Sequence, residues 1–310
     1  MFNLLTTGYL FLGGAGAGAL VVLGALECAN VRRRFALPPA RAARVERALA
    51  LPDEFFARGW PVCFVALAAG MLCLLVDLGR PERLLNLLTS PEPSAIAVGA
   101  YALVLALACA GVFSLVELLD GVRVRPAVVW GAAVAGVAAG LVAVAYTGVL
   151  LQGLASVLFW QTPLLPMLFS LSSLSCGIAV VLVAAFFADP EGEAGRIVRP
   201  LVRADAALIV LEAAAAALFA GLALAGGHPG AAASAVQLVD GSGAPAWWGG
   251  FVLCGLAVPL AVELAFAVRE RSQARALPPA LRTALAVAAV LVLVGGFSMR
   301  SAIVDAGMHR

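Results

Sequence analysis

Residues 126–151 read PAVVWGAAVAGVAAGLVAVAYTGVLL, a stretch without a single Asp, Glu, Lys or Arg. A helix that crosses the hydrocarbon core of a bilayer needs about 20 mostly apolar residues, and this stretch exceeds that length. Comparable apolar runs precede and follow it, so that the set covers residues 7–30, 59–77, 95–119, 126–151, 164–187, 204–226, 247–268 and 281–304. The pattern predicts an all-α integral membrane protein with eight transmembrane helices.

The composition supports the same conclusion. Hydrophobic residues make up 63% of the chain and charged residues only 12%, whereas a soluble domain carries about 25% charged residues. We therefore expect the chain to be embedded in a lipid bilayer. The basic residues lie in short connections and form no extended basic stripe, so a nucleic-acid partner is not expected.

Arginine positions predict the orientation, because cytoplasmic loops retain basic residues. All 20 basic residues are Arg. Only four fall on the side that also holds both chain ends, namely Arg80, Arg83, Arg300 and Arg310. The other sixteen are Arg32, Arg33, Arg34, Arg41, Arg44, Arg47, Arg58, Arg123, Arg125, Arg196, Arg199, Arg203, Arg269, Arg271, Arg275 and Arg282. Both termini are therefore expected outside the cytoplasm, N-out and C-out.

A weak internal sequence repeat suggests that the chain consists of two similar halves. Val116-Glu117-Leu118 in the third apolar run matches Val262-Glu263-Leu264 in the seventh, four predicted helices later. We therefore expect two four-helix bundles, residues 1–152 and residues 153–310.

The histidines and cysteines argue against metal cofactors. A membrane-bound b-type haem needs paired axial histidines from helices, but His228 and His309 both lie outside the apolar runs. The six cysteines lie inside apolar runs and none is spaced as CxxC, which is unlike a cysteine-ligated iron–sulfur cluster or zinc site. The sequence thus predicts no haem, no iron–sulfur cluster and no metal site in this chain.

The glycine-rich segment Gly13–Gly18 does not resemble a dinucleotide-binding loop, because it lies within an apolar run and no strand precedes it. Gly14 and Gly18 form a GxxxG pattern that favours close helix packing. The alternative is a cavity wall at which a flat ligand approaches the backbone.

Polar residues in apolar runs are costly in hydrocarbon and are functional candidates by default. Each also has a structural interpretation: a helix-end ion pair for Asp77 and Arg80, interfacial aromatics for Tyr146 and the tryptophans, and solvated acids for Glu27 and Asp205. Toward the predicted outside lie Asp77, Arg80, Tyr146, Gln152, Arg300 and Asp305; toward the cytoplasm lie Glu27, Glu117, Asp205 and Glu263, with Glu212 deeper in its helix.

Five segments in order resemble the NrfD-like, or polysulphide-reductase membrane-subunit, family along nearly the whole chain. They are residues 9–18 (YLFLGGAGAG), 77–83 (DLGRPER), 145–151 (AYTGVLL), 159–166 (FWQTPLLP) and 295–300 (GGFSMR). The resemblance implies a haem-free subunit that binds menaquinone or ubiquinone near the outer face. It also implies electron exchange with an iron–sulfur subunit docked there, which serves a further catalytic subunit, in the cytoplasmic membrane of a bacterium or archaeon.

The candidate residues can be given roles in quinone chemistry, which needs hydrogen-bond donors and a proton-exchanging acid. Asp77 is the expected acid, Tyr146 a donor to a quinone oxygen, and Arg80 the group that holds the Asp77 charge or docks the partner. Further candidates for binding the quinone are Tyr9, Gly14, Gly18, Gln152, Trp160 and Arg300. A proton route from the cytoplasm would use Glu27, Glu117, Asp205, Glu212 and Glu263. A secondary transporter with Glu212 in its site and a passive membrane anchor remain alternatives.

Overall fold

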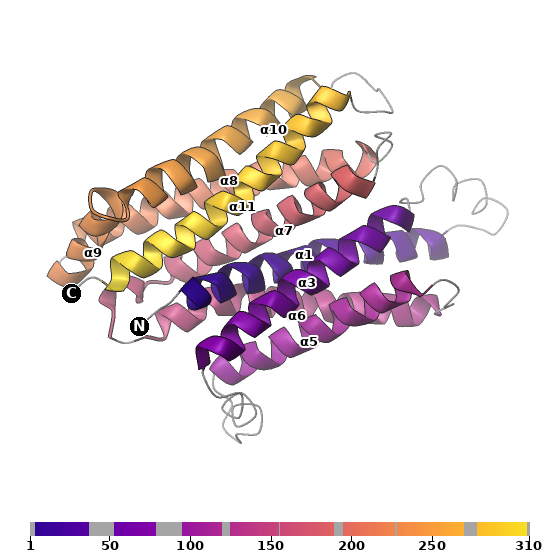
Figure 1. Ribbon diagram of the computed structural model, residues 1–310, viewed down its shortest axis with the longest axis horizontal. Helices are drawn as coiled ribbons and strands as arrows, with labels where there is room; N and C mark the ends of the chain where they lie inside the picture. Colours follow the sequence, from indigo (N-terminus) through magenta and orange to yellow (C-terminus); the bar gives the residue numbers. More distant parts are fainter. Residues whose placement is uncertain are drawn as a thin grey trace.

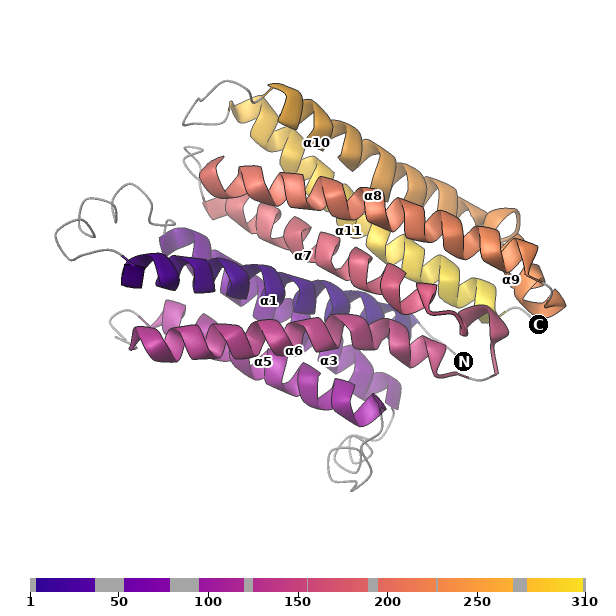
Figure 2. The same ribbon diagram turned by 180° about the vertical axis from the view of Figure 1, so that it is seen from behind.

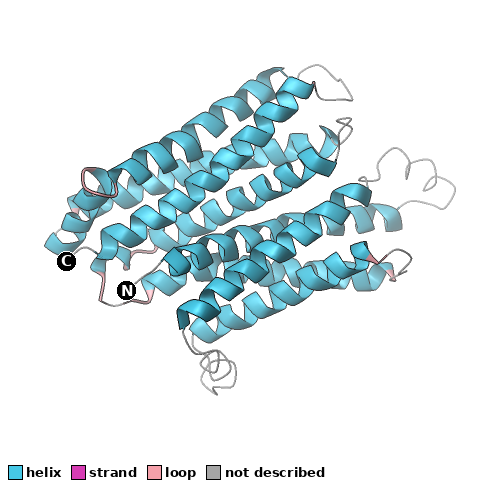
Figure 3. Cartoon of the chain, viewed as in Figure 1, coloured by secondary structure: helices cyan, strands magenta, loops and turns pink. Residues whose placement is uncertain are grey.

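The computed structural model describes residues 4–36, 53–78, 95–119, 125–154, 156–188, 195–226, 228–269 and 278–308. Its long helices are α1 (Leu4–Ala36), α3 (Asp53–Leu78), α5 (Ala95–Leu118), α6 (Pro126–Gln152), α7 (Leu164–Ala188), α8 (Gly195–Ala225), α10 (Val258–Arg269) and α11 (Pro279–Met308). The remaining elements are the 3₁₀ turn η1 (Leu158–Trp160), helix α9 (Pro229–Val239) and the π-helical segment η2 (Pro245–Ala257), which continues into α10 and forms one long span with it. No strand occurs in these described ranges (Figure 3).

Eight helical spans are long and apolar enough to cross a membrane, which confirms the predicted fold class. They are Leu4–Asn30, Phe55–Asp77, Ala97–Leu118, Pro126–Gln152, Leu164–Ala188, Ile197–Ala225, Pro245–Val268 and Pro279–Met308. The sixth span begins before the predicted residue 204, because the helix continues through Arg199 and Arg203, whereas the hydropathy pattern stops at charged residues.

The helices lie side by side in one elongated arrangement. Helices α1, α3, α5 and α6 neighbour one another, as do α7, α8, α10 and α11, and Figures 1 and 2 show these groups from opposite sides. Helix α1 begins and α11 ends at the same end of the bundle, which we call the terminal end (Figure 1). The outward orientation of this end remains a prediction. So does the division of the chain into two four-helix halves, residues 1–152 and 153–310.

Helices α1 and α7 form the centre of the protein. About two thirds of each span's apolar window, 67%, is buried against protein, compared with 28–44% for the other six spans. The contact depends on glycine, because a Cβ at Gly18 would overlap the carbonyl of Ser173 and a Cβ at Gly177 would overlap the backbone of Gly18. The GxxxG pattern therefore packs α1 against α7, as the structural interpretation predicted.

The tryptophans only partly match their predicted role as interfacial anchors. Trp130 and Trp248 are exposed and able to meet lipid headgroups. Trp60, Trp160 and Trp247 are buried, so the prediction is wrong for these three. Trp60 stacks on Phe113 with ring centroids 4.3 Å apart, and Trp160 donates from Nε1 to the carbonyl of Ile303 at 3.2 Å. Both rings therefore join helices within the protein.

Candidate functional site

A first polar cluster occupies the terminal end of α1, α3 and α6. It consists of Thr6 and Tyr9 on α1, Asp77 on α3 and Tyr146 on α6, and we call it the tyrosine–aspartate cluster. Thr6 and Tyr9 are three residues apart on one helix and therefore lie on the same face. The Thr6 hydroxyl donates to Asp77 Oδ2 at 2.8 Å, which ties α1 to the last turn of α3.

The two tyrosines of this cluster lie against each other inside the protein. Tyr9 is 1% exposed and Tyr146 8% exposed, and a Cβ at Gly99 of α5 would overlap the Tyr146 ring. Their hydroxyl groups are near neighbours but do not form a hydrogen bond of ordinary geometry, so Tyr9 Oη has no partner among the described residues. A buried phenol normally finds a partner. The Tyr9 hydroxyl is thus a hydrogen-bond donor beside Tyr146 that is available to a ligand.

A second polar cluster is centred on Arg300 of α11, which is fully buried. Nη1 donates to Ser172 Oγ at 3.2 Å and to the carbonyl of Gly296 at 2.8 Å, while Nη2 donates to Ser173 Oγ at 2.8 Å and to the carbonyl of Phe169 at 3.5 Å. The guanidinium also lies over the Phe169 ring at 5.2 Å. Arg300 Nε has no partner among the described residues.

Three buried acids continue from Arg300 through α8 to α10. Glu212 lies beside Ser172 and close enough to Arg300 for the two charges to interact. Because Arg300 also donates to Ser172, this serine lies next to both groups. Asp205 Oδ1 accepts a hydrogen bond of 2.6 Å from Ser175, and Glu263 lies next to Asp205. We call this set the acid–arginine chain; it consists of Arg300, Ser172, Glu212, Ser175, Asp205 and Glu263.

The three acids of the chain are almost completely removed from solvent and lipid. Glu212 is 3% exposed, Asp205 is fully buried and Glu263 is 2% exposed. Asp205 Oδ2 and Glu263 Oε2 have no hydrogen-bond partner in the described part of the protein. Two neighbouring carboxyl groups in an apolar interior cannot both carry a charge without compensation. The arrangement is therefore suited to hold and pass protons.

The other predicted site residues are distributed as follows. Gly14 borders the second cluster, because a Cβ there would lie 3.2 Å from Arg300 Nη2. Gly18 contacts backbone of α7, and the indole N–H of Trp160 is bound to Ile303. Gln152 is the half-buried last residue of α6. Arg80 lies outside the described residues.

Glu27 and Glu117 are half-buried; Glu27 lies in the last third of α1 and Glu117 is the penultimate residue of α5. They belong to α1 and α5, whereas the acid–arginine chain is built from α7, α8, α10 and α11. The structure thus gathers Asp205, Glu212 and Glu263 around Arg300 and leaves these two acids on other helices.

Sequence reasoning missed the hydroxyl groups that connect the charged residues. Ser172, Ser173 and Ser175 lie within an apolar helix, and their spacing of one and three residues was the available signal. Thr6 could have been found as a polar residue one helical turn before Tyr9. Arg300 was grouped with the quinone-binding candidates, whereas its hydrogen-bond partners here are on α7 and α11.

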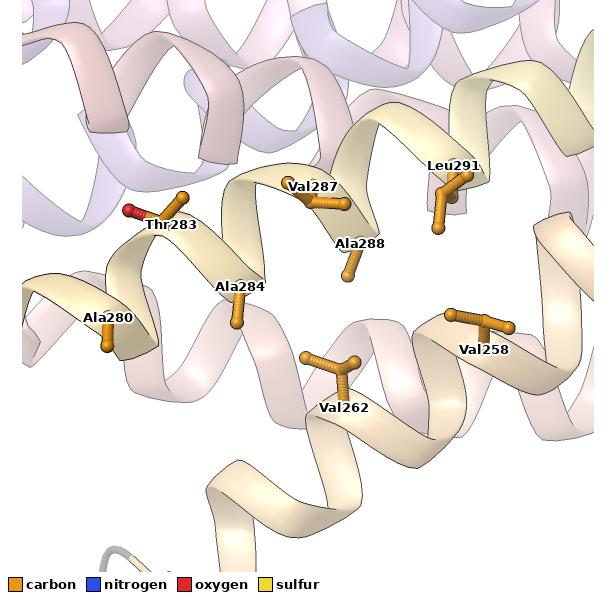
Figure 4. A pocket seen from close by; sticks show the side chains of 8 residues that line it. All are labelled: Val258, Val262, Ala280, Thr283, Ala284, Val287, Ala288 and Leu291. Carbon is orange, nitrogen blue, oxygen red and sulfur yellow. The ribbon is translucent and has the colours of Figure 1, made fainter.

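A groove of about 510 Å³ lies elsewhere, between α10 and α11 (Figure 4). Thr283 is the sole polar side chain among its lining residues, which are otherwise Val258, Val262, Ala280, Ala284, Val287, Ala288 and Leu291. It contains none of the predicted site residues and offers no charged group to a ligand.

The described ranges contain no group of three or more His, Cys, Asp or Glu side chains that could hold a metal ion. The cysteines are free thiols.

Comparison with known families gives a match over the full length. The profile of the family described as "Polysulphide reductase, NrfD" matches residues 1–310. The comparison with curated proteins finds no match. Because the family profile covers the whole chain, and the helices have the expected membrane-spanning character, this chain belongs to the NrfD family, whose members are membrane subunits of quinone-interacting oxidoreductase complexes.

Proposed function

We propose that this chain binds a quinone at the tyrosine–aspartate cluster and exchanges electrons there with an iron–sulfur subunit docked on the terminal end. The observation that carries the proposal is the Tyr9 hydroxyl, which is buried beside Tyr146 and makes no hydrogen bond of ordinary geometry with any residue that the structure describes. Asp77, by contrast, is exposed at the end of α3. The cluster therefore offers donors inside the protein and an acid at its edge.

The reaction assigns a role to each group. Reduction of a quinone to a quinol takes up two electrons and two protons, and oxidation releases them. Tyr146 and Tyr9 donate hydrogen bonds to one quinone oxygen, Asp77 exchanges one of the two protons with that oxygen, and the second proton exchanges with water at the other quinone oxygen. From its position in the sequence, Arg80 remains the candidate that keeps Asp77 charged or contacts the partner. The family resemblance favours menaquinone or ubiquinone.

Electrons come from or go to another subunit, because the sequence offers no transmembrane histidine pair and no cysteine spacing typical of a cluster. The iron–sulfur subunit would in turn serve a further catalytic subunit. The arginine asymmetry supports an orientation in which the terminal end, and with it the proposed docking face, lies on the outer side of the cytoplasmic membrane of a bacterium or archaeon.

We further propose that the acid–arginine chain carries protons from the cytoplasmic side toward the quinone. Glu263 and Asp205 stand nearer the end opposite to the terminal end, Glu212 lies deeper, and Arg300 lies beside Gly14 of α1. Gly14 follows Tyr9 by five residues, which is about 7.5 Å along a helix axis at 1.5 Å per residue. Water bound to the unpartnered oxygens of Asp205 and Glu263 would complete the route. Glu27 and Glu117 remain candidates for the residues at which protons enter this route from the cytoplasm, within residues 1–152.

Two alternatives are weaker. A secondary transporter would use Glu212 as a site near the middle of the membrane, but the sequence shows no convincing inverted repeat of the kind from which many such transporters are built. A passive anchor would not need buried acids, each of which costs about 2.5–3.5 kcal/mol at the bilayer centre on insertion scales.

The test uses the intact purified complex and measures quinone turnover. Tyr146→Phe, Tyr9→Phe and Asp77→Asn should each lower turnover at least about tenfold, because each removes a group that donates to the quinone or exchanges its proton. Tyr101→Phe is the matched control, since Tyr101 is an exposed tyrosine of α5 and should leave turnover unchanged. Wild-type kinetics in both Tyr146→Phe and Asp77→Asn would refute the proposed site.

A further inference from the structure

We propose that Thr6 is a positioning residue for Asp77: its hydroxyl holds one carboxylate oxygen, so that the other remains available for proton exchange. The proposal rests on the quinone site described above and adds to it a residue that carries no charge. Its basis is the hydrogen bond from Thr6 Oγ1 to Asp77 Oδ2, 2.8 Å long.

The location of Asp77 favours such a partner. Asp77 is the penultimate residue of α3. The C-terminal end of a helix carries partial negative charge, so a carboxylate in the last turn is electrostatically unfavourable. The side chain is also exposed and has several rotamers to choose from. A donor from a neighbouring helix both compensates the charge and selects one rotamer.

Thr6 is well suited to be that donor. A threonine inside a helix often donates to a carbonyl of its own helix, but the Thr6 hydroxyl donates to Asp77 on α3 instead. Thr6 is 5% exposed, and the branched side chain has few rotamers, so the donor is fixed in place.

The bond also sets the geometry of the cluster. With Oδ2 occupied by Thr6, Oδ1 is the oxygen left to exchange a proton. Thr6 and Tyr9 share one face of α1. The first turns of this helix therefore hold Asp77 through Thr6 and contact Tyr146 through Tyr9. The acid and the donor are thereby placed by one rigid element, which is what proton transfer within hydrogen-bond reach requires.

The neighbouring residue provides a matched control. Thr7 is also a threonine in the first turn of α1 and is similarly buried, at 6% exposure. The structure assigns it no hydrogen bond to Asp77. Replacement of Thr7 by valine changes the same chemistry at nearly the same depth without touching the carboxylate.

The experiment measures steady-state quinone turnover by the purified complex carrying Thr6→Val, Thr6→Ser, Thr7→Val, Asp77→Asn or the pair Thr6→Val with Asp77→Asn. Thr6→Val should lower kcat about tenfold with KM little changed, because it removes one hydrogen bond to a charged group. Thr6→Ser and Thr7→Val should keep wild-type turnover. In the Asp77→Asn background, Thr6→Val should have no additional effect.

The outcomes separate this inference from the proposed site. If Asp77→Asn turns over normally, the role of Asp77 itself is refuted. If Asp77→Asn is impaired but Thr6→Val is normal, the site stands and the positioning role of Thr6 is refuted. An equal loss from Thr6→Val in both backgrounds would also overturn it, because that loss would not pass through Asp77. Should Thr6→Val fail to assemble, Thr6→Ala and Thr6→Ser make the same comparison with less branched side chains.

Discussion

The buried guanidinium of Arg300 allows a quantitative prediction about the charge within the second polar cluster. Arg300 donates to Ser172 and Ser173 on α7, and hydrogen bonds between membrane helices contribute about 0.6 kcal/mol each on average, hence about 1.2 kcal/mol for the two. Its charge also acts on Glu212. Removing one partner of a buried charge pair costs about 3–5 kcal/mol, and we expect the low end, about 3 kcal/mol, because no direct ion pair forms here.

The charge should therefore matter more than the hydrogen bonds. Arg300→Lys keeps the charge and loses the forked geometry, so it should cost about 1 kcal/mol. Arg300→Met removes both and should cost about 3 kcal/mol or more. Adding Glu212→Gln to Arg300→Met should restore about 1–3 kcal/mol, because the remaining acid is no longer left without its cation.

The assay is equilibrium unfolding of the purified protein in mixed micelles, followed by circular dichroism. Arg203→Met is the control, because Arg203 is an exposed arginine near the start of α8 and its loss should leave the unfolding midpoint unchanged. Equal losses for Arg300→Lys and Arg300→Met would refute the reasoning. So would a double variant no more stable than Arg300→Met.

Three further predictions concern the proton route, the orientation in the membrane and the contact between α1 and α7. In reconstituted vesicles, Glu212→Gln and Glu263→Gln should slow proton uptake from the cytoplasmic side during quinone turnover; unchanged uptake in both would exclude a route through them. A reporter fused after Arg310 should be active outside the cytoplasm, and activity inside alone would reverse the predicted orientation. Gly18→Leu should prevent accumulation of folded protein, because the new side chain would overlap the α7 backbone, whereas Gly131→Leu, at a glycine with open space around it, should accumulate normally.

Much of the fold could be predicted from sequence because the bilayer makes helix formation a local matter. Backbone groups in hydrocarbon must be paired within the same segment, so an apolar run of sufficient length becomes a helix whatever its neighbours are. For this reason each of the eight apolar segments of the sequence corresponds to one membrane-spanning helix. The errors of the prediction concern the residues at which the helices begin and end. The start of α8 was placed too late because charged residues such as Arg199 extend a helix beyond the hydrocarbon.

The candidate residues could be named from sequence, but the contacts between them could not. Asp205, Glu212, Glu263 and Arg300 stood out because each is costly within an apolar run. Hydropathy does not tell which of these residues contact one another, and only the structure shows that Arg300 donates to the serines of α7. Serine and threonine give little signal on such scales, so Thr6 and Ser172 were passed over although they bind the charged groups.

The sequence by itself therefore determined the membrane class, the number of helices, the family and the list of costly polar residues, because each depends on local composition or on a short ordered motif. The tertiary structure decided which of those residues meet. Glycines on α1 and α7 let the two backbones touch. This close approach brings Arg300 beside Gly14 of α1 and within hydrogen-bond reach of the α7 serines. Such contacts arise between residues far apart in the chain, and only the packing of side chains in three dimensions selects them.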